Sequence, residues 1–252
     1  MNIVRVPFRV SLFGGGTDFK YFYSKKKATV ISFTIDRYCY ISIKKLLPYS
    51  KVNYHISWNK LETVENISEI KHPSIKACLN YLNIKDPLCI HTIGDLPARS
   101  GVGSSSAFTA ALLSSLYLYK NKTFTASSIA EKTIFVEQEI LKENVGIQDQ
   151  IQVCHGGFNI TSIFPDSRYS LLSLNNSSSI VQEIGESLIL VFSGISRTSS
   201  EIQEELAVAL TNNELIESLN KINLIAENFS EKLTKHTANY DLFEELLNEA
   251  WA

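Results

Sequence analysis

The stretch that decides the fold is a glycine- and serine-rich loop followed by an apolar run. It reads Gly94-Asp95-Leu96-Pro97-Ala98-Arg99-Ser100-Gly101-Val102-Gly103-Ser104-Ser105-Ser106. Residues 88–93 before it are β-prone, and residues 107–119 after it form an apolar run with strong helical character, which predicts a strand, a loop and a helix in succession. Gly101 and Gly103 let the backbone bend tightly, and a helix start offers N–H groups and a positive dipole end. The pattern predicts a phosphate-binding site, although a flexible turn that only caps a helix has the same composition.

Other strands and helices flank this loop. Alternating β-branched and aromatic residues predict strands at residues 3–13, 28–33, 37–44, 51–56, 158–163 and 187–192. Helical spacing predicts helices at 73–82, 125–142, 200–210, 213–233 and 241–251. Thr125 is the expected N-cap of the helix at 125–142. Its capping box is incomplete because a serine occupies the position that a Glu or Gln usually takes. The order of elements predicts a mixed α/β fold, which we divide into residues 1–185 and a second domain at 186–252.

Composition and charge restrict the class of protein. Hydrophobic residues make up 44% of the chain and charged residues 20%, with a formal net charge of -2, which is typical of a globular protein and does not favour nucleic acid or an anionic membrane. The four cysteines are isolated, with no CxxC pair, and no apolar segment resembles a signal peptide or a membrane span. We therefore expect a soluble cytoplasmic protein with free thiols and no nucleic-acid or membrane partner.

Two further motifs carry polar groups suited to chemistry. Arg9 lies on the first predicted strand, which ends in Gly14-Gly15-Gly16-Thr17-Asp18. Three glycines would let the chain pass close to a substrate, and Asp18 could accept hydrogen bonds from sugar hydroxyls; the plain alternative is a glycine-rich hairpin. The second motif is Gly146-Ile147-Gln148-Asp149-Gln150, in which Asp149 could accept a proton from a hydroxyl or could simply cap a helix. Glu137 lies upstream on a predicted helix, where its carboxylate could hold Mg²⁺ opposite Ser105.

Taken together, these motifs resemble those of the GHMP kinases. The first family motif is similar to Pro7-Phe8-Arg9-Val10-Ser11-Leu12-Phe13-Gly14-Gly15-Gly16-Thr17-Asp18, and the second is similar to residues 96–107. The triple glycine followed by Thr-Asp is typical of the sugar kinases similar to D-glycero-D-manno-heptose 7-phosphate kinase and fucokinase. Residues 148–150, 156–159 and 194–199 also resemble that branch.

The resemblance implies a fold, a reaction and residue roles. It implies a ribosomal protein S5 domain 2-like N-terminal domain, a ferredoxin-like second domain, and ATP-dependent phosphorylation of a hydroxyl on a sugar or sugar phosphate, with Mg²⁺. Asp149 matches the catalytic carboxylate and Arg9 its basic companion, while Ser105 and Glu137 match the metal ligands. The residues that match the ATP loop are Pro97, Ser100, Gly101, Val102, Gly103, Ser104, Ser105 and Ser106. The residues that match the sugar contacts are Gly15, Gly16, Thr17 and Asp18.

One departure from the family pattern concerns the last part of the chain. No glycine follows Gly194, whereas the family has a third glycine-rich segment near its C-terminus. We therefore expect the chain to lack its C-terminal end, the ferredoxin-like domain to be incomplete, and the apolar face of the helix at 213–233 to be under-covered. Dimerisation through that face and low kinase activity are the expected consequences. The alternatives are a catalytically impaired or non-catalytic relative that only binds nucleotide or sugar, and a decarboxylase of the same superfamily, which the Gly-Gly-Gly-Thr-Asp turn counts against.

Overall fold

The protein has two compact units. The computed structural model describes residues 1–50, 52–98, 100–174, 178–191, 194 and 213–251. The first unit comprises residues 1–8, 35–144 and 149–155, and the second comprises residues 9–34, 145–148 and the chain from Gly156 onward. Both units are therefore assembled from separate stretches of sequence. The boundary expected near residue 185 stays a prediction.

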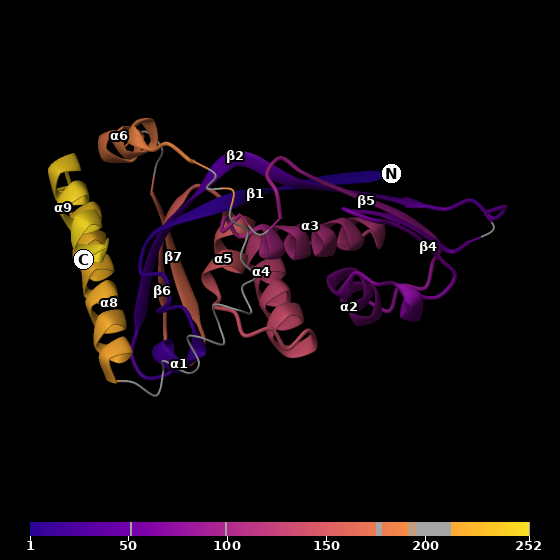
Figure 1. The fold of residues 1–252 in the computed structure, drawn as a ribbon, viewed down its shortest axis with the longest axis horizontal. Helices are drawn as coiled ribbons and strands as arrows, with labels where there is room; N and C mark the ends of the chain where they lie inside the picture. Colours follow the sequence, from indigo (N-terminus) through magenta and orange to yellow (C-terminus); the bar gives the residue numbers. More distant parts are fainter. Residues whose placement is uncertain (51, 99, 175–177, 192–193, 195–212, 252) are drawn as a thin grey trace. The chain divides into compact units, whose positions relative to one another are not determined.

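The strands form a mixed sheet of seven described strands (Figure 1). β1 (Asn2–Phe13) pairs with the long β2 (Ala28–Lys45), and both strands contribute residues to the two units. In the first unit, β2 pairs antiparallel with β5 (Leu88–Gly94), β5 pairs parallel with β3 (Tyr54–Ser57), and β3 pairs antiparallel with β4 (Leu61–Val64). In the second unit, β2 pairs antiparallel with β6 (Phe158–Ile163), and β6 with β7 (Tyr169–Leu174). The predicted mixed α/β class is confirmed, while the S5-like and ferredoxin-like subdivisions stay predictions.

Helices cover one face of the strands of the first unit (Figure 1). They are η1 (Ile67–Glu69), α2 (Pro73–Tyr81), α3 (Ser104–Tyr119), α4 (Ala126–Phe135), the π-helix η2 (Val136–Ile140) and α5 (Gln148–His155). α3 is apolar on nearly every side because it lies in the middle of this core, where Leu112 packs in one cluster with Ile41 and Ile90. The capping box at Thr125 is complete, contrary to our expectation, because Ser128 is the partner: its Oγ accepts from Thr125 N at 3.0 Å.

The second unit has its own core beneath α8 (Asn213–Thr234) and α9 (Tyr240–Trp251), which lie beside β6 and β7 in Figure 1. Phe13 of β1 meets Phe229 of α8 with 5.3 Å between ring centroids and Phe243 of α9 with 6.0 Å. Asn223 of α8, fully buried, accepts a hydrogen bond from the backbone N–H of Thr29 at 2.8 Å. The expectation of an under-covered face on this helix is therefore wrong for its central residues. Leu219, Ile225, Ala226 and Phe229 are buried, and the last three pack in one cluster with residues of β1, β2, β6 and α9. α1 (Lys20–Tyr23) and α6 (Ser179–Ser187) complete this unit in the described chain.

Exposed apolar side chains occur instead just after α6. The expected strand at 187–192 is wrong in its described part, because Ser187 ends α6 and Leu188–Val191 has no regular structure. Ile189 is 85% exposed and Val191 79%. β-Branched composition favours a strand, but a strand also needs a hydrogen-bonded neighbour, and no described strand pairs with this segment. Phe192, the segment 195–199 and the predicted helix at 200–210 lie outside the described residues.

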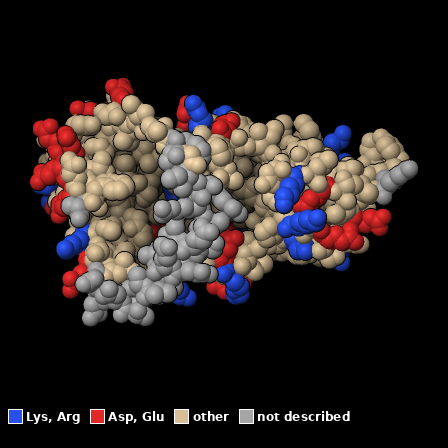
Figure 2. All heavy atoms as spheres, in the orientation of Figure 1, with Lys and Arg blue, Asp and Glu red and all other residues tan. Residues whose placement is uncertain are grey.

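The surface carries both signs of charge, with acidic side chains gathered over α9 (Figure 2). This helix is amphipathic: Phe243 and Leu246 are buried, and the acidic residues Asp241, Glu244, Glu245 and Glu249 are exposed on its outer side. None of the helices in the described ranges is both long enough and apolar enough to cross a membrane.

Candidate nucleotide and sugar sites

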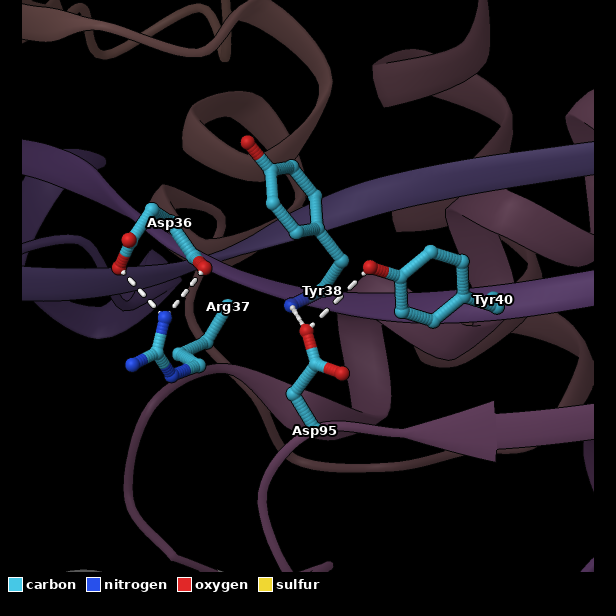
Figure 3. Close-up of polar contacts among 5 residues, drawn as sticks. All are labelled: Asp36, Arg37, Tyr38, Tyr40 and Asp95. Atoms are coloured by element: carbon cyan, nitrogen blue, oxygen red, sulfur yellow. Dashed lines mark hydrogen bonds and ion pairs between the residues drawn. The ribbon is translucent and has the colours of Figure 1, made fainter.

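Asp95 fixes the point at which the glycine-serine loop leaves β5 (Figure 3). Its carboxylate accepts from the backbone N–H of Tyr38 at 2.8 Å and from the hydroxyl of Tyr40 at 3.4 Å, and its own N–H donates to Tyr38 O at 3.0 Å. These bonds tie the end of β5 to β2. The neighbouring ion pair between Asp36 and Arg37, at 2.9 Å, is exposed and contributes little to stability.

The loop reaches α3 through two glycines in the left-handed region. Gly101 has φ of +77° and Gly103 has φ of +70°, where a side chain would be strained. Gly103 is the N-cap of α3 and has no side chain with which to cap the helix. Ser100 Oγ is buried and has no hydrogen-bond partner among the described residues. A helix start with a glycine N-cap, beside an unsatisfied hydroxyl, suits an anionic ligand such as phosphate. Arg99 lies outside the described residues, and Pro97 is exposed.

A buried carboxylate lies close to this N-terminus. Glu137 is 1% exposed, and its Oε2 accepts from Ser106 Oγ at 3.0 Å and from Gln150 Nε2 at 2.6 Å. The residue is carried by η2, a π-helical turn, which is a rare conformation often found at functional sites. Three elements, α3, η2 and α5, therefore converge on one carboxylate inside the first unit.

The electrostatics of Glu137 suit a cation. Burial raises the pKa of Glu137 to about 7, a shift to which the charge of Glu143 adds and which hydrogen bonds from Gln150 and Ser106 oppose. Its second oxygen, Oε1, is buried without a hydrogen-bond partner among the described residues. A hard cation would supply that partner and favour the ionised form, so the donor set fits Mg²⁺. The described residues contain no group of three or more His, Cys, Asp or Glu side chains arranged around a metal, so further ligands would have to be hydroxyls, waters or phosphate oxygens.

The serines at the start of α3 differ in placement. Ser106 is 4% exposed and donates to Glu137, whereas Ser105, the expected metal ligand, is exposed and has its backbone carbonyl bound by Thr109 Oγ1 at 3.2 Å. The metal role of Ser105 stays a prediction, and Ser106 joins it as a candidate because it is the serine that contacts Glu137.

The glycine turn after β1 belongs to the second unit, and packing explains two of its glycines. Gly14 and Gly16 have φ of +86° and +89°, and a Cβ on them would lie 2.0 Å from Thr29 O and 3.0 Å from Leu219 Cδ2. A Cβ on Gly15 would meet only ordinary contacts, the nearest being Ser11 Oγ at 3.6 Å. Thr17 is fully buried and donates to Gly14 O at 2.7 Å. Backbone strain and close packing therefore require glycine at 14 and 16 whether or not a substrate approaches.

Asp18 lies inside the same unit and binds the residue before Asp149. It is 2% exposed; its Oδ2 accepts from Gln148 N at 3.1 Å, and its Oδ1 accepts from Gln148 Nε2 and Gly16 N, each at 3.1 Å. Gln148 Oε1 in turn accepts from Ser11 Oγ at 2.9 Å. Asp149 is the next residue, in the first turn of α5, and is half-buried; Arg9 is a half-buried residue of β1. The roles predicted for Asp18, Asp149 and Arg9 stay predictions.

Part of the chain matches the model of a known protein family. Residues 69–157 match the family model for the GHMP kinases N terminal domain. This stretch of the chain is therefore similar to the N-terminal domain of the GHMP kinases. The matched range contains the whole glycine-serine loop, Glu137 and Asp149, whereas Arg9 and Asp18 precede it. The family resemblance predicted from the motifs is confirmed.

Individual relatives extend the likeness over almost the whole chain. A D-glycero-alpha-D-manno-heptose 7-phosphate kinase of Campylobacter jejuni is 25% identical over 259 residues, covering 98% of this chain and 75% of the relative. A bifunctional fucokinase/GDP-fucose pyrophosphorylase of Arabidopsis thaliana is 28% identical over 65% of this chain and 16% of its own length. The structure of a D-glycero-D-manno-heptose 1-phosphate kinase from "Bacteriodes thetaiotaomicron" superposes with a TM-score of 0.80 at 21% identity, covering 99% of this chain and 78% of that one. That structural likeness concerns the fold.

Three contributors to these sites were not predicted from the sequence. They are the contact of Ser106 with Glu137, the buried amide of Gln150, and the amide of Gln148 that binds Asp18. A signal was present, since glutamines flank Asp149 on both sides, but nothing in the sequence indicates which distant carboxylate each glutamine meets.

Proposed function

We propose that this protein is an ATP-dependent kinase that transfers a phosphoryl group to a hydroxyl of a sugar phosphate, with a heptose 7-phosphate as the first candidate. The observation that carries the proposal is the buried carboxylate of Glu137, bound by Ser106 and Gln150 beside the glycine-capped start of α3. The likeness to the Campylobacter heptose 7-phosphate kinase supports the substrate class.

The nucleotide is bound by the first unit through its phosphates. Gly101 and Gly103 leave room at the backbone, and the start of α3 directs N–H groups and its positive dipole end at an anion. Ser100 Oγ and the serines at the start of α3 add hydroxyl donors. These groups would orient the terminal phosphoryl and balance the charge that develops on it, which is the main contribution a protein makes to phosphoryl transfer.

Glu137 would hold Mg²⁺ together with a hydroxyl of Ser105 or Ser106. When bound, the cation neutralises charge on the phosphates. Gln150 keeps the Glu137 side chain in one orientation by donating to Oε2, which leaves Oε1 to face the cation. The raised pKa of Glu137 means that the same residue is partly protonated near neutral pH until a cation is present.

Asp149 is the proposed acceptor of the proton from the attacking sugar hydroxyl. It is half-buried and lies in the first turn of α5, one residue before Gln150, so the helix that orders the metal-site amide also carries the proposed base. Arg9 is the proposed basic companion of Asp149, as the family resemblance implies. Gly15, Gly16 and Thr17 stay proposed sugar contacts.

The test is a coupled ADP-release screen with Mg²⁺ and ATP. The sugars are heptose 7-phosphate, heptose 1-phosphate, fucose, galactose and, as a non-sugar control, mevalonate. We expect turnover on a heptose phosphate and none on mevalonate. Heptose 7-phosphate and heptose 1-phosphate are both tested because one of the two relatives is named for each of them. A nucleotide-dependent thermal shift without turnover on any sugar would overturn the kinase assignment and support a nucleotide-binding relative.

A further inference from the structure

Asp18 has its hydrogen-bonding capacity largely occupied by the protein itself. A carboxylate offers roughly four acceptor positions, and Asp18 accepts from Gly16 N, Gln148 N and Gln148 Nε2, each at 3.1 Å. Only 2% of the residue is exposed. A side chain so placed is better suited to hold protein groups than to meet a sugar hydroxyl.

The backbone around Asp18 is joined to the same turn. Ile147 N donates to Asp18 O at 3.2 Å, so main chain and side chain both bind the segment that leads into α5. A Cβ on Gly146 would lie 1.8 Å from Asp18 Oδ2, and this glycine is therefore required for the carboxylate to reach Gln148. All of these residues belong to the second unit.

The bond to Gln148 N makes Asp18 a distant N-cap of α5. Gln148 is the first residue of this helix, and a negative charge that accepts one of the first N–H groups is favourable at a helix N-terminus. Gln148 is held at a second point, because its Oε1 accepts from Ser11 Oγ at 2.9 Å. The backbone and side chain of the residue that precedes Asp149 are thus fixed together.

We propose that Asp18 and Gln148 are positioning residues that set the start of α5 and thereby the orientation of the Asp149 carboxylate. This proposal rests on the proposed kinase function. Asp18 acts through Gln148 and not as the principal sugar ligand. Ser11 completes the arrangement by orienting the Gln148 amide. A displacement of about 1 Å at such a point can lower a rate by about 100-fold without changing substrate affinity.

The test is a double-mutant cycle of Asp18→Asn and Gln148→Leu, measured as kcat and KM for ATP and for the sugar phosphate. We expect each single variant to lower kcat by about 10- to 100-fold with both KM values within about threefold of wild type. The double variant should be no slower than the slower single variant, because both changes remove the same interaction. If Asp18→Asn instead raises the sugar KM tenfold with kcat retained, and Gln148→Leu is silent, the positioning role is overturned in favour of a direct sugar contact.

A second readout does not depend on turnover. Amide hydrogen exchange of the first turn of α5 should be faster in Asp18→Asn by about tenfold, since the Gln148 N–H loses its charged acceptor. Asn223→Ala is the stability control, because it removes a buried amide elsewhere in the same unit and should leave exchange at α5 and kcat per folded molecule unchanged. Unchanged exchange at α5 in Asp18→Asn would overturn the inference. A wild-type protein with no turnover on any sugar would instead overturn the proposed function, and the exchange experiment would still decide the capping role.

Discussion

Gly146→Ala tests how tightly Asp18 is packed against the turn before α5. The new Cβ would lie 1.8 Å from Asp18 Oδ2 and 2.5 Å from its Cγ, whereas real contacts of this kind are not closer than 3.0 Å. Either the turn that carries the new Cβ or the Asp18 carboxylate must therefore move by at least 1.2 Å (3.0 − 1.8). A shift of that size away from the turn lengthens the bond between Asp18 Oδ2 and Gln148 N well beyond its present 3.1 Å.

The expected loss of stability follows from the bonds that break. Hydrogen bonds to a charged group contribute about 1.5–3 kcal/mol each, and a Gly-to-Ala change in an unstrained position returns about 0.4–1 kcal/mol through the unfolded state. If one of the two Asp18–Gln148 bonds is lost and the other weakened, the free energy of unfolding should fall by about 2 kcal/mol. For a chain of this size, that is a decrease in Tm of about 4–8 °C.

The assay is thermal and urea unfolding of Gly146→Ala beside two companions. Gly185→Ala is the matched control, because Gly185 lies within α6 and a Cβ there would meet no heavy atom of the described residues within 4 Å outside the backbone of its own helix. This variant should be neutral or slightly stabilised. The double variant Asp18→Ala, Gly146→Ala should be no less stable than Asp18→Ala alone, because the carboxylate that the new Cβ would meet is then absent. A Gly146→Ala protein as stable as the wild type would refute the packing described here.

Three further outcomes are expected. Asp149→Asn should lower kcat by about 10²–10⁴-fold while ATP binding measured by titration stays close to wild type, and a variant within threefold of wild type would remove Asp149 from the mechanism. Glu137→Gln should weaken the binding of Mg²⁺-ATP more than the binding of metal-free ATP in paired titrations. Ser105→Ala and Ser106→Ala are titrated in the same way, and the variant that reproduces this pattern identifies the hydroxyl that binds the cation with Glu137. Burial against Trp58 and Phe108, with ring centroids 4.8 and 4.5 Å away, lowers the pKa of His72 to about 4. The unfolded chain therefore binds the proton first, so the free energy of unfolding should fall as the pH falls from about 6.5 towards 4. Between about pH 6.5 and 5, wild type should lose about 1.6 kcal/mol more than His72→Phe. Equal losses for the two proteins in urea titrations would contradict this.

Many of the elements could be predicted because their signals are local. The strand at 88–93, the helix at 107–119 and the strand at 158–163 correspond to β5, α3 and β6 within a few residues, since apolar runs and flanking glycines mark them directly. β7 was missed: Leu172 is exposed beside Ser170 and Ser173, so the strand lacks a regular alternation of apolar and polar residues. The segment Leu188–Val191 shows the opposite error, because a strand-like composition cannot supply a neighbouring strand.

The family resemblance could be predicted from the sequence because it rests on residue type and short spacing. A glycine-serine loop before an apolar helix, an aspartate in a Gly-Ile-Gln-Asp-Gln turn and a triple glycine followed by Thr-Asp resemble the motifs of the GHMP kinases, and the family model matches the range that contains the first two. The roles of the residues in these motifs stay predictions.

The tertiary structure decided which residues meet. Each step along a helix turns the side chain by about 100°, so the exact start of α3 determines that Ser106, and not Ser105, contacts Glu137. Asp18 and Gln148 are 130 positions apart, and only the folding of the second unit brings them to 3.1 Å. Residue type is a property of the chain, whereas helix phase and long-range pairing depend on how the core packs, and these determine which polar groups are buried together.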